Sequence, residues 1–87
     1  MRHTSILLDM TIQQKIGLRI KALRAQKELK QEHLAWQSEL DRTYMNHVEN
    51  GKRNLTVNSL QKIVEKGLKM SLTDFFNDPI FEVKNNK

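Results

Sequence analysis

The chain has 87 residues, no Cys, and fifteen Lys and Arg residues against ten Asp and Glu residues, a formal net charge of +5. A chain this short builds one core, and the lack of Cys excludes disulfides, a thiol nucleophile and a Cys-ligated zinc site. The longest apolar run, residues 6–8, is too short for a membrane span or a signal peptide. We therefore expect a small soluble intracellular protein whose positive charge permits a polyanion as partner.

Apolar residues recur at helical spacing along almost the whole chain, and no alternating strand pattern competes. The first predicted helix covers residues 12–26, because Thr11 and Gln14 make a capping box in front of it. Its inner face is expected to carry four apolar residues, namely Ile12, Ile16, Ile20 and Leu23. A second helix is predicted over residues 31–38, with the small Ala35 on its inner face.

Three further helices complete the predicted fold. Asp41 is expected to cap a third helix over residues 42–49, which Gly51 ends because glycine accepts a left-handed backbone. A fourth helix is predicted over residues 57–66, and a short fifth helix begins after Ser71. The fold class is therefore all-α, a compact bundle of five short helices around one core.

The second and third predicted helices are joined by about four residues, a pattern typical of the helix-turn-helix, whose second helix enters the DNA major groove. If Met45 and Val48 point inward, the outer face of the third helix is polar and has no carboxylate. The outward residues are then Thr43, Asn46, His47 and Asn50, with Arg42 on the flank and Tyr44 nearer the inner edge. Arg42 could pair with guanine and Asn46 with adenine, and His47 is expected to contact DNA or solvent.

Residues around these two helices are expected to contact phosphates. They are Gln31 at the start of the second helix and Lys52, Arg53 and Asn54 after the third. The same spacing also fits a helical bundle whose polar face binds no DNA, and the spacing alone leaves that alternative open.

Several short stretches resemble the Cro/repressor (XRE-type) helix-turn-helix family, whose fold is lambda-repressor-like. They are Ile16-Gly17, Arg19-Ile20, Leu23-Arg24, Gln31-Glu32, Leu34-Ala35 and residues 48–53, VENGKR. Residues 40–44, LDRTY, and 53–68, RNLTVNSLQKIVEKGL, look like the controller proteins of bacterial restriction–modification systems. The resemblance covers about residues 12–76. It implies a homodimeric transcription factor that binds operator DNA upstream of its own gene and the endonuclease gene.

The resemblance also implies residue roles. It places four residues in or near the major groove, namely Arg42, Thr43, Tyr44 and Asn46. It assigns phosphate or base contacts to Gln31, Asn50, Arg53 and Asn54. The dimer interface would include Leu72, Phe75 and Phe76, although neighbouring helical positions point about 100° apart, so one of the two Phe side chains would face the partner. A bacterial, cytoplasmic, nucleoid-associated protein is implied, with RNA polymerase as a further partner if it activates transcription.

Two positions depart from the family pattern, and one residue is ambiguous. Glu39 stands in the inter-helix turn where the family often has Gly, so a left-handed backbone there should cost about 1 kcal/mol. Lys30 replaces the common Ser or Thr cap, which should weaken the start of the second helix by about 1 kcal/mol. Trp36 is expected to pack on the core beside the first helix, and a place near the DNA backbone is the alternative.

We expect residues 1–10 to form an N-terminal extension, residues 11–78 the DNA-binding and dimerisation domain, and residues 79–87 a C-terminal tail, with regular structure ending at Pro79. The three His residues lack metal-ligand spacing, and no catalytic set is visible. No metal, cofactor, small-molecule ligand or enzymatic activity is therefore expected. The alternatives are a phage- or plasmid-type repressor, an antitoxin with a protein partner, and a protein-binding helical module.

Overall fold

The computed structural model describes residues 9–83, which form helices and turns and contain no strand within that range. The elements are α2 (Ile12–Gln26), α3 (Gln31–Gln37), α4 (Arg42–Glu49), α5 (Val57–Gln61), the π-helix η1 (Lys62–Gly67), α6 (Leu72–Phe76) and the 3-10 helix η2 (Pro79–Phe81). The prediction of an all-α fold is confirmed. The first 8 residues, which hold most of the expected N-terminal extension, and residues 84–87 of the expected tail lie outside the described residues.

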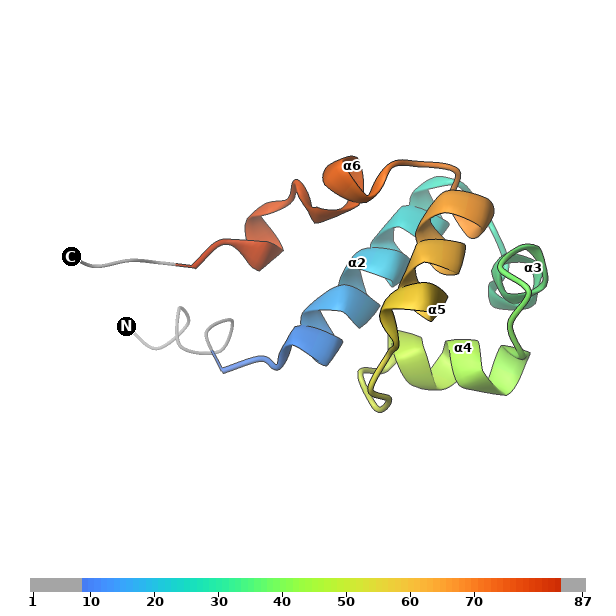
Figure 1. Cartoon of the computed structure of the whole chain (residues 1–87), viewed down its shortest axis with the longest axis horizontal. Coiled ribbons are helices and arrows are strands. Elements are labelled where there is room, and N and C mark those ends of the chain that lie inside the picture. The colour runs from blue at the N-terminus through green and yellow to red at the C-terminus, as the bar shows by residue number, and fades with distance from the viewer. Residues whose placement is uncertain (1–8, 84–87) are drawn as a thin grey trace.

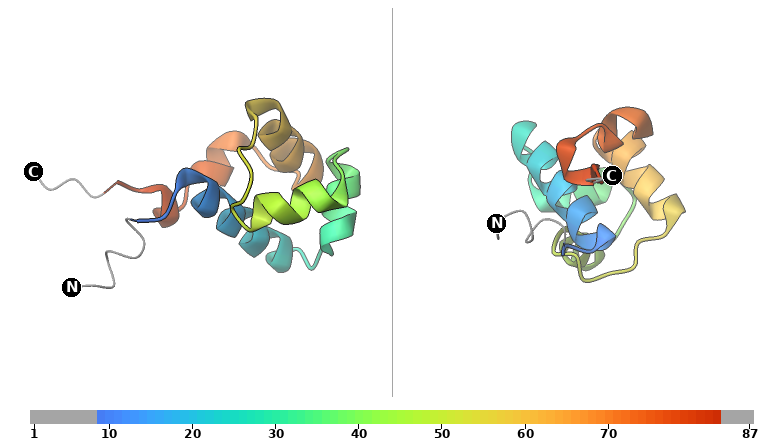
Figure 2. Two further views of the ribbon diagram at one scale, coloured as in Figure 1. Left: turned by 90° about the horizontal axis from the view of Figure 1, so that it is seen from below. Right: turned by 90° about the vertical axis from the view of Figure 1, so that its left-hand side faces the viewer.

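The helices α3 and α4 lie at one end of the molecule, while the first and last described segments lie at the other end (Figure 1). Seen from below, α4 runs along the face nearest the viewer (Figure 2). No helix among residues 9–83 is long and apolar enough to cross a membrane. Over the same range, the His, Asp and Glu side chains form no group of three that could hold a metal ion.

Side-chain caps fix the starts of most helices. The side chains that accept backbone N–H groups at a helix start include Thr11, Asp41, Thr56 and Ser71. The predicted capping box is present: the backbone N–H of Gln14 donates to Thr11 Oγ1 at 3.1 Å, and that of Thr11 donates to Gln14 Oε1 at 2.9 Å. Lys30 gives α3 no side-chain cap, as predicted.

Four helical elements are followed by a residue with a left-handed backbone. These residues are Glu28 (φ 56°), Glu39 (φ 61°), Gly51 (φ 69°) and Lys69 (φ 58°). The turn between α3 and α4 therefore keeps a left-handed backbone at Glu39, where the family often has Gly. After it, the backbone N–H of Leu40 donates to the Ala35 carbonyl at 2.9 Å, which closes the end of α3 in a Schellman-type turn. The three positions that are not glycine each carry a conformational cost of about 1 kcal/mol.

The core lies where α2, α3, α4, η1 and α6 meet. Its buried residues are Ile20, Leu23, Leu34, Ala35, Met45, Val48, Ile63, Val64, Leu68 and Phe75. At Gly17, α2 approaches α4 so closely that a Cβ atom would lie 2.5 Å from the Val48 carbonyl oxygen. Ile12 was expected on the inner face but is 54% exposed, because it lies on the rim of an open hollow beside Leu55.

The predicted fourth helix changes character halfway along. It is α-helical only to Gln61, and η1 then continues with wider turns, in which the backbone N–H of Leu68 donates to the Ile63 carbonyl at 2.8 Å. At its end Gly67 lies against α3, where a Cβ atom would be 2.6 Å from Leu34 Cδ1. The absence of a side chain at Gly67 is what allows η1 to lie this close to α3.

Regular structure does not end at Pro79, so that prediction is wrong. Pro79 begins η2, because the Asp78 side chain caps this 3-10 turn. Arg19 of α2 holds the preceding helix α6, because its guanidinium donates to the carbonyls of Phe75 at 2.8 Å and Asp74 at 3.0 Å. Arg19 also forms an ion pair with Asp78 at 3.0 Å, which ties the C-terminal segment to the body of the domain.

Candidate nucleic-acid interface

The predicted helix-turn-helix is present as α3, a four-residue turn and α4. Ala35 is buried on the inner side of α3, and Leu40 in the turn packs against the core. The inner side of α4 is formed by Met45 and Val48, both buried as predicted. This packing leaves the opposite side of α4 on the surface, where a partner can reach it (Figure 2).

The residues predicted to read bases differ in exposure. The exposed ones are Arg42, Thr43 and Asn46, and the half-buried ones are Tyr44 and His47. Tyr44 packs against the core, and the Arg53 guanidinium lies 5.1 Å from the centre of its ring. This contact joins the loop after α4 to the first turn of that helix.

Arg42 has a carboxylate beside it that the helical pattern of the sequence does not predict. Its guanidinium lies 3.4 Å from the carboxylate of Glu32 on α3, and the two side chains are 66% and 64% exposed. The outer face of α4 itself carries no acid, as predicted, but α3 places one at its edge. An ion pair this exposed is weak, so Arg42 can leave it at little cost to bind another partner.

A buried ion pair lies directly behind this surface. The Arg24 guanidinium of α2 donates to both oxygens of Glu49 in α4, at 2.7 and 3.0 Å, and also to the Leu29 carbonyl at 2.9 Å. The Glu49 side chain is only 1% exposed. Helical spacing does not predict this pair, because its members stand 25 residues apart.

A chain of side-chain amides runs outward from the buried pair. Gln31 Nε2 donates to Glu49 at 3.0 Å, and Gln31 Oε1 accepts from Asn46 Nδ2 at 3.3 Å. Asn46 Oδ1 in turn accepts from Asn50 Nδ2 at 3.3 Å. Three residues expected at bases or phosphates, from two helices, are therefore connected by hydrogen bonds.

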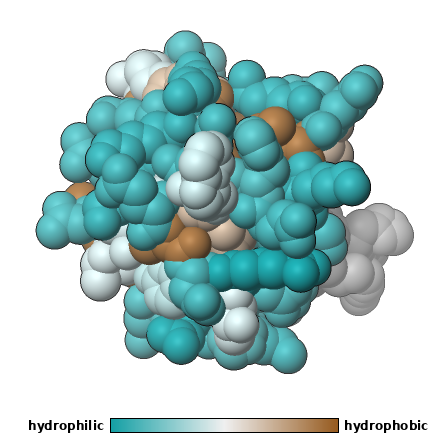
Figure 3. All heavy atoms as spheres, turned by 90° about the vertical axis from the view of Figure 1, so that its right-hand side faces the viewer, coloured by the Kyte–Doolittle hydropathy of each residue, from teal (hydrophilic) through white to brown (hydrophobic). Residues whose placement is uncertain are grey.

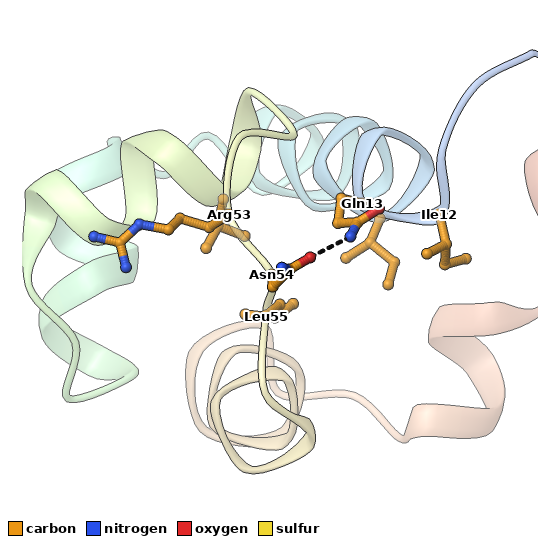
Figure 4. Close-up of a pocket in the computed structure, with 7 residues that line it drawn as sticks. Ile12, Gln13, Arg53, Asn54 and Leu55 are labelled. Carbon is orange, nitrogen blue, oxygen red and sulfur yellow. Dashed lines mark hydrogen bonds between the residues drawn. The ribbon is translucent and has the colours of Figure 1, made fainter.

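The loop after α4 holds the remaining residues predicted to contact phosphates. Lys52, Arg53 and Asn54 are all exposed. Asn54 accepts a hydrogen bond from Gln13 of α2, while the Arg53 side chain points away from that pair (Figure 4). The loop is therefore fastened to the start of α2, and its Arg53 side chain reaches back along α4 to the Tyr44 ring.

Comparisons with known proteins show what this arrangement belongs to. Residues 20–74 match the helix-turn-helix family. The control protein C.MunI of Mycoplasma sp is 45% identical over 65 residues, which cover 74% of this chain and 86% of that protein. The chain belongs to the helix-turn-helix family, among the restriction–modification controller proteins.

Solved structures agree with that assignment. The wild-type restriction–modification controller protein C.Esp1396I is 43% identical and matches with a TM-score of 0.72, over 78% of this chain and 88% of that one. C.AhdI from Aeromonas hydrophila is 38% identical with a TM-score of 0.69, over 74% of this chain and 96% of that one. C.Esp1396I has been solved as a tetramer in complex with its natural 35 base-pair operator. The resemblance found in the sequence is thus confirmed, and the family consists of DNA-binding transcriptional regulators.

The C-terminal residues expected at a controller-protein dimer interface lie in two different environments. Phe75 is fully buried within the chain, where its ring forms part of the core. Phe76 is 38% exposed and meets the Phe81 ring at 4.9 Å, and Leu72 is partly buried. Of the two neighbouring Phe residues, Phe76 is therefore the one available to a second subunit.

Trp36 does not pack on the core, so that expectation is wrong. Its side chain is 74% exposed, because Leu34 and Ala35 take the inner positions of the short helix α3 and Trp36 follows on its outer side. Close to Trp36, Lys66 lowers the pKa of Glu39, mainly through a hydrogen bond to the Glu39 carboxylate and secondly through its positive charge. The end of the molecule that carries α3 is largely hydrophilic (Figure 3).

Proposed function

We propose that this chain binds operator DNA as a homodimer and regulates restriction–modification genes, with α4 of each subunit in a major groove. The observation that carries the proposal is the outer face of α4, which is polar, free of acids and presented by a helix-turn-helix. Two-fold symmetry would set half-sites about one helical turn, roughly 34 Å, apart. Dimerisation supplies the affinity and specificity that one small domain lacks.

The individual residues take roles that follow from their chemistry. Arg42 can offer two parallel donors to guanine, once it leaves Glu32, and Asn46 can pair with adenine. Thr43, Tyr44 and His47 complete the surface that faces the base edges. The residues proposed at phosphates are Asn50, Lys52, Arg53 and Asn54. Because these contacts displace counterions, binding should fall steeply as salt rises.

The rest of the proposal concerns the setting of the protein. It works in the bacterial cytoplasm on nucleoid DNA, has no enzymatic activity of its own, and contacts RNA polymerase where it activates transcription. Residues 11–78 carry DNA binding and dimerisation. The segment Pro79–Phe81 supports that domain through its contact with α2.

Two measurements test this function. A mobility shift on random duplex DNA at low salt should show binding, and a chain that binds no DNA there would be a protein-binding module instead. Selection of bound sites from random DNA should then return a sequence with two-fold symmetry. An unsymmetric site, or equal recovery of all sequences, would contradict a dimer that reads bases through α4.

A further inference from the structure

The chain of hydrogen-bonded side-chain amides on the outer side of α3 and α4 begins at a buried carboxylate, which sets the orientation of the first amide. Glu49 accepts two hydrogen bonds from Arg24, at 2.7 and 3.0 Å, and a third from Gln31 at 3.0 Å. An ionised carboxylate has acceptors and no donor, so the neighbouring amide must turn its NH₂ group inward. Gln31 is therefore fixed with Nε2 toward the core and Oε1 toward the surface.

That choice propagates outward. Because Gln31 presents an oxygen, Asn46 must turn Nδ2 toward it, and the two atoms lie 3.3 Å apart. Asn46 Oδ1 then faces the other way and accepts from Asn50 Nδ2, again at 3.3 Å. Gln31 is thus held in one of its two possible orientations by the Glu49 carboxylate, and Asn46 and Asn50 are each held by the amide before them.

We propose that Glu49 and Gln31 are positioning residues that set, through this chain of amides, the orientation in which Asn46 meets a base pair. The inference rests on the proposed function, because it assumes that α4 reads DNA. An Asn that pairs with adenine needs one N–H group and one oxygen in a defined order. Asn46 keeps one free N–H and one free acceptor site after its two hydrogen bonds, so the fixed amide can still make such a pair.

The alternative for Gln31 is the role expected from the sequence, a contact with a phosphate. The two roles leave different signatures. A phosphate contact lowers affinity for all sequences about equally, whereas a positioning role changes the preference at one base pair. A measurement of base preference therefore separates them, and a loss of stability alone would not imitate the second signature.

The test uses Gln31→Met, which keeps the length of the side chain but can neither donate to Glu49 nor accept from Asn46. Asn46→Ala first identifies the base pair that Asn46 reads, by selection of bound sites from random DNA. Gln31→Met should then lower the preference at that same base pair by about tenfold and leave the others unchanged. Gln37→Met is the matched control, because Gln37 lies on the same helix and outside the amide chain, and it should select the wild-type site.

The double variant completes the experiment. With Asn46→Ala already present, adding Gln31→Met should change the preference at that base pair little further, because its effect passes through Asn46. The inference is overturned if Gln31→Met weakens all sequences equally, or if Asn46→Ala changes the preference at no base pair. Either result would leave the proposal that the chain binds DNA uncontradicted. If the wild-type chain binds no DNA, the proposed function fails, and this result is seen before any variant is made.

Discussion

Arg24 and Glu49 form a doubly hydrogen-bonded ion pair that joins α2 to α4 directly behind the outer face of the helix-turn-helix. The guanidinium is 18% exposed and the carboxylate 1%. A buried charge is tolerated only when its hydrogen bonds are made, and here Arg24 supplies two of them. The pair therefore stabilises the domain and holds α4 in place against α2.

Arg24→Met should lower the free energy of unfolding by about 3–5 kcal/mol, because it leaves the Glu49 carboxylate buried without its cation. Urea unfolding followed by circular dichroism measures the change. Lys21→Met is the control, since Lys21 is an exposed cation on the same helix. Equal losses of unfolding free energy in the two variants would show that the ion pair stabilises the domain no more than an exposed cation does.

Arg42→Ala should weaken binding to the selected site by about 1–3 kcal/mol and relax the preference at one base pair, because a bidentate contact with guanine is lost. Glu32→Gln should strengthen DNA binding, since it removes the carboxylate that pairs with Arg42 and repels nearby phosphates. Titrations with specific and random duplexes measure both. An unchanged base preference in Arg42→Ala would remove Arg42 from the reading surface.

Lys52→Ala should weaken binding to all sequences about equally and make the dependence of affinity on salt less steep by about one unit of slope. The reason is that an exposed ammonium after α4 contacts phosphate as a point charge and reads no base. Titrations of one selected and one random duplex at several salt concentrations measure this. A change in base preference would mean that Lys52 reaches into the groove.

The helix boundaries were predictable because local chemistry determines them. The bounds of α2 and α4 agree with the prediction at both ends, since Thr11 and Asp41 accept the first free N–H groups and Gly51 follows α4 in the left-handed region. The left-handed backbone at Glu39 has a different basis, because a Glu side chain disfavours it and only the resemblance to the family, which often has Gly at this position, points to it.

Contacts between distant residues were not predictable from the same rules. The buried pair of Arg24 and Glu49 depends on how α2 crosses α4, which helical periodicity does not specify. Trp36 was placed wrongly because a helix of 7 residues has too few turns to define its inner face. Neither the wide turns of η1 nor the close packing of Gly67 against α3 has a local signal in the sequence.

Glu28→Gly should raise the free energy of unfolding by about 0.5–1 kcal/mol. Glu28 has φ 56°, where a side chain is strained and glycine is not, although glycine also gives the unfolded chain more freedom. Thermal and urea unfolding measure the change. The matched control is Glu32→Gly in the first turn of α3, which should lower stability by up to about 1 kcal/mol because glycine has a lower helix propensity than Glu. A loss of stability in both variants would contradict the account of strain at Glu28.

Phe76→Asp should raise the dissociation constant of the homodimer by about tenfold or more, because it replaces the exposed aromatic side chain of α6 with a charged one. Sedimentation velocity over a range of protein concentrations gives the dissociation constant, and circular dichroism checks that the helices remain. Val57→Asp is the control: Val57 is also apolar, is 79% exposed, and lies on α5. Phe75→Ala should act differently, by lowering stability about 3–5 kcal/mol, since its ring fills the core. If Phe76→Asp and Val57→Asp both dimerise like the wild type, α6 does not form the interface and another surface must join the two subunits.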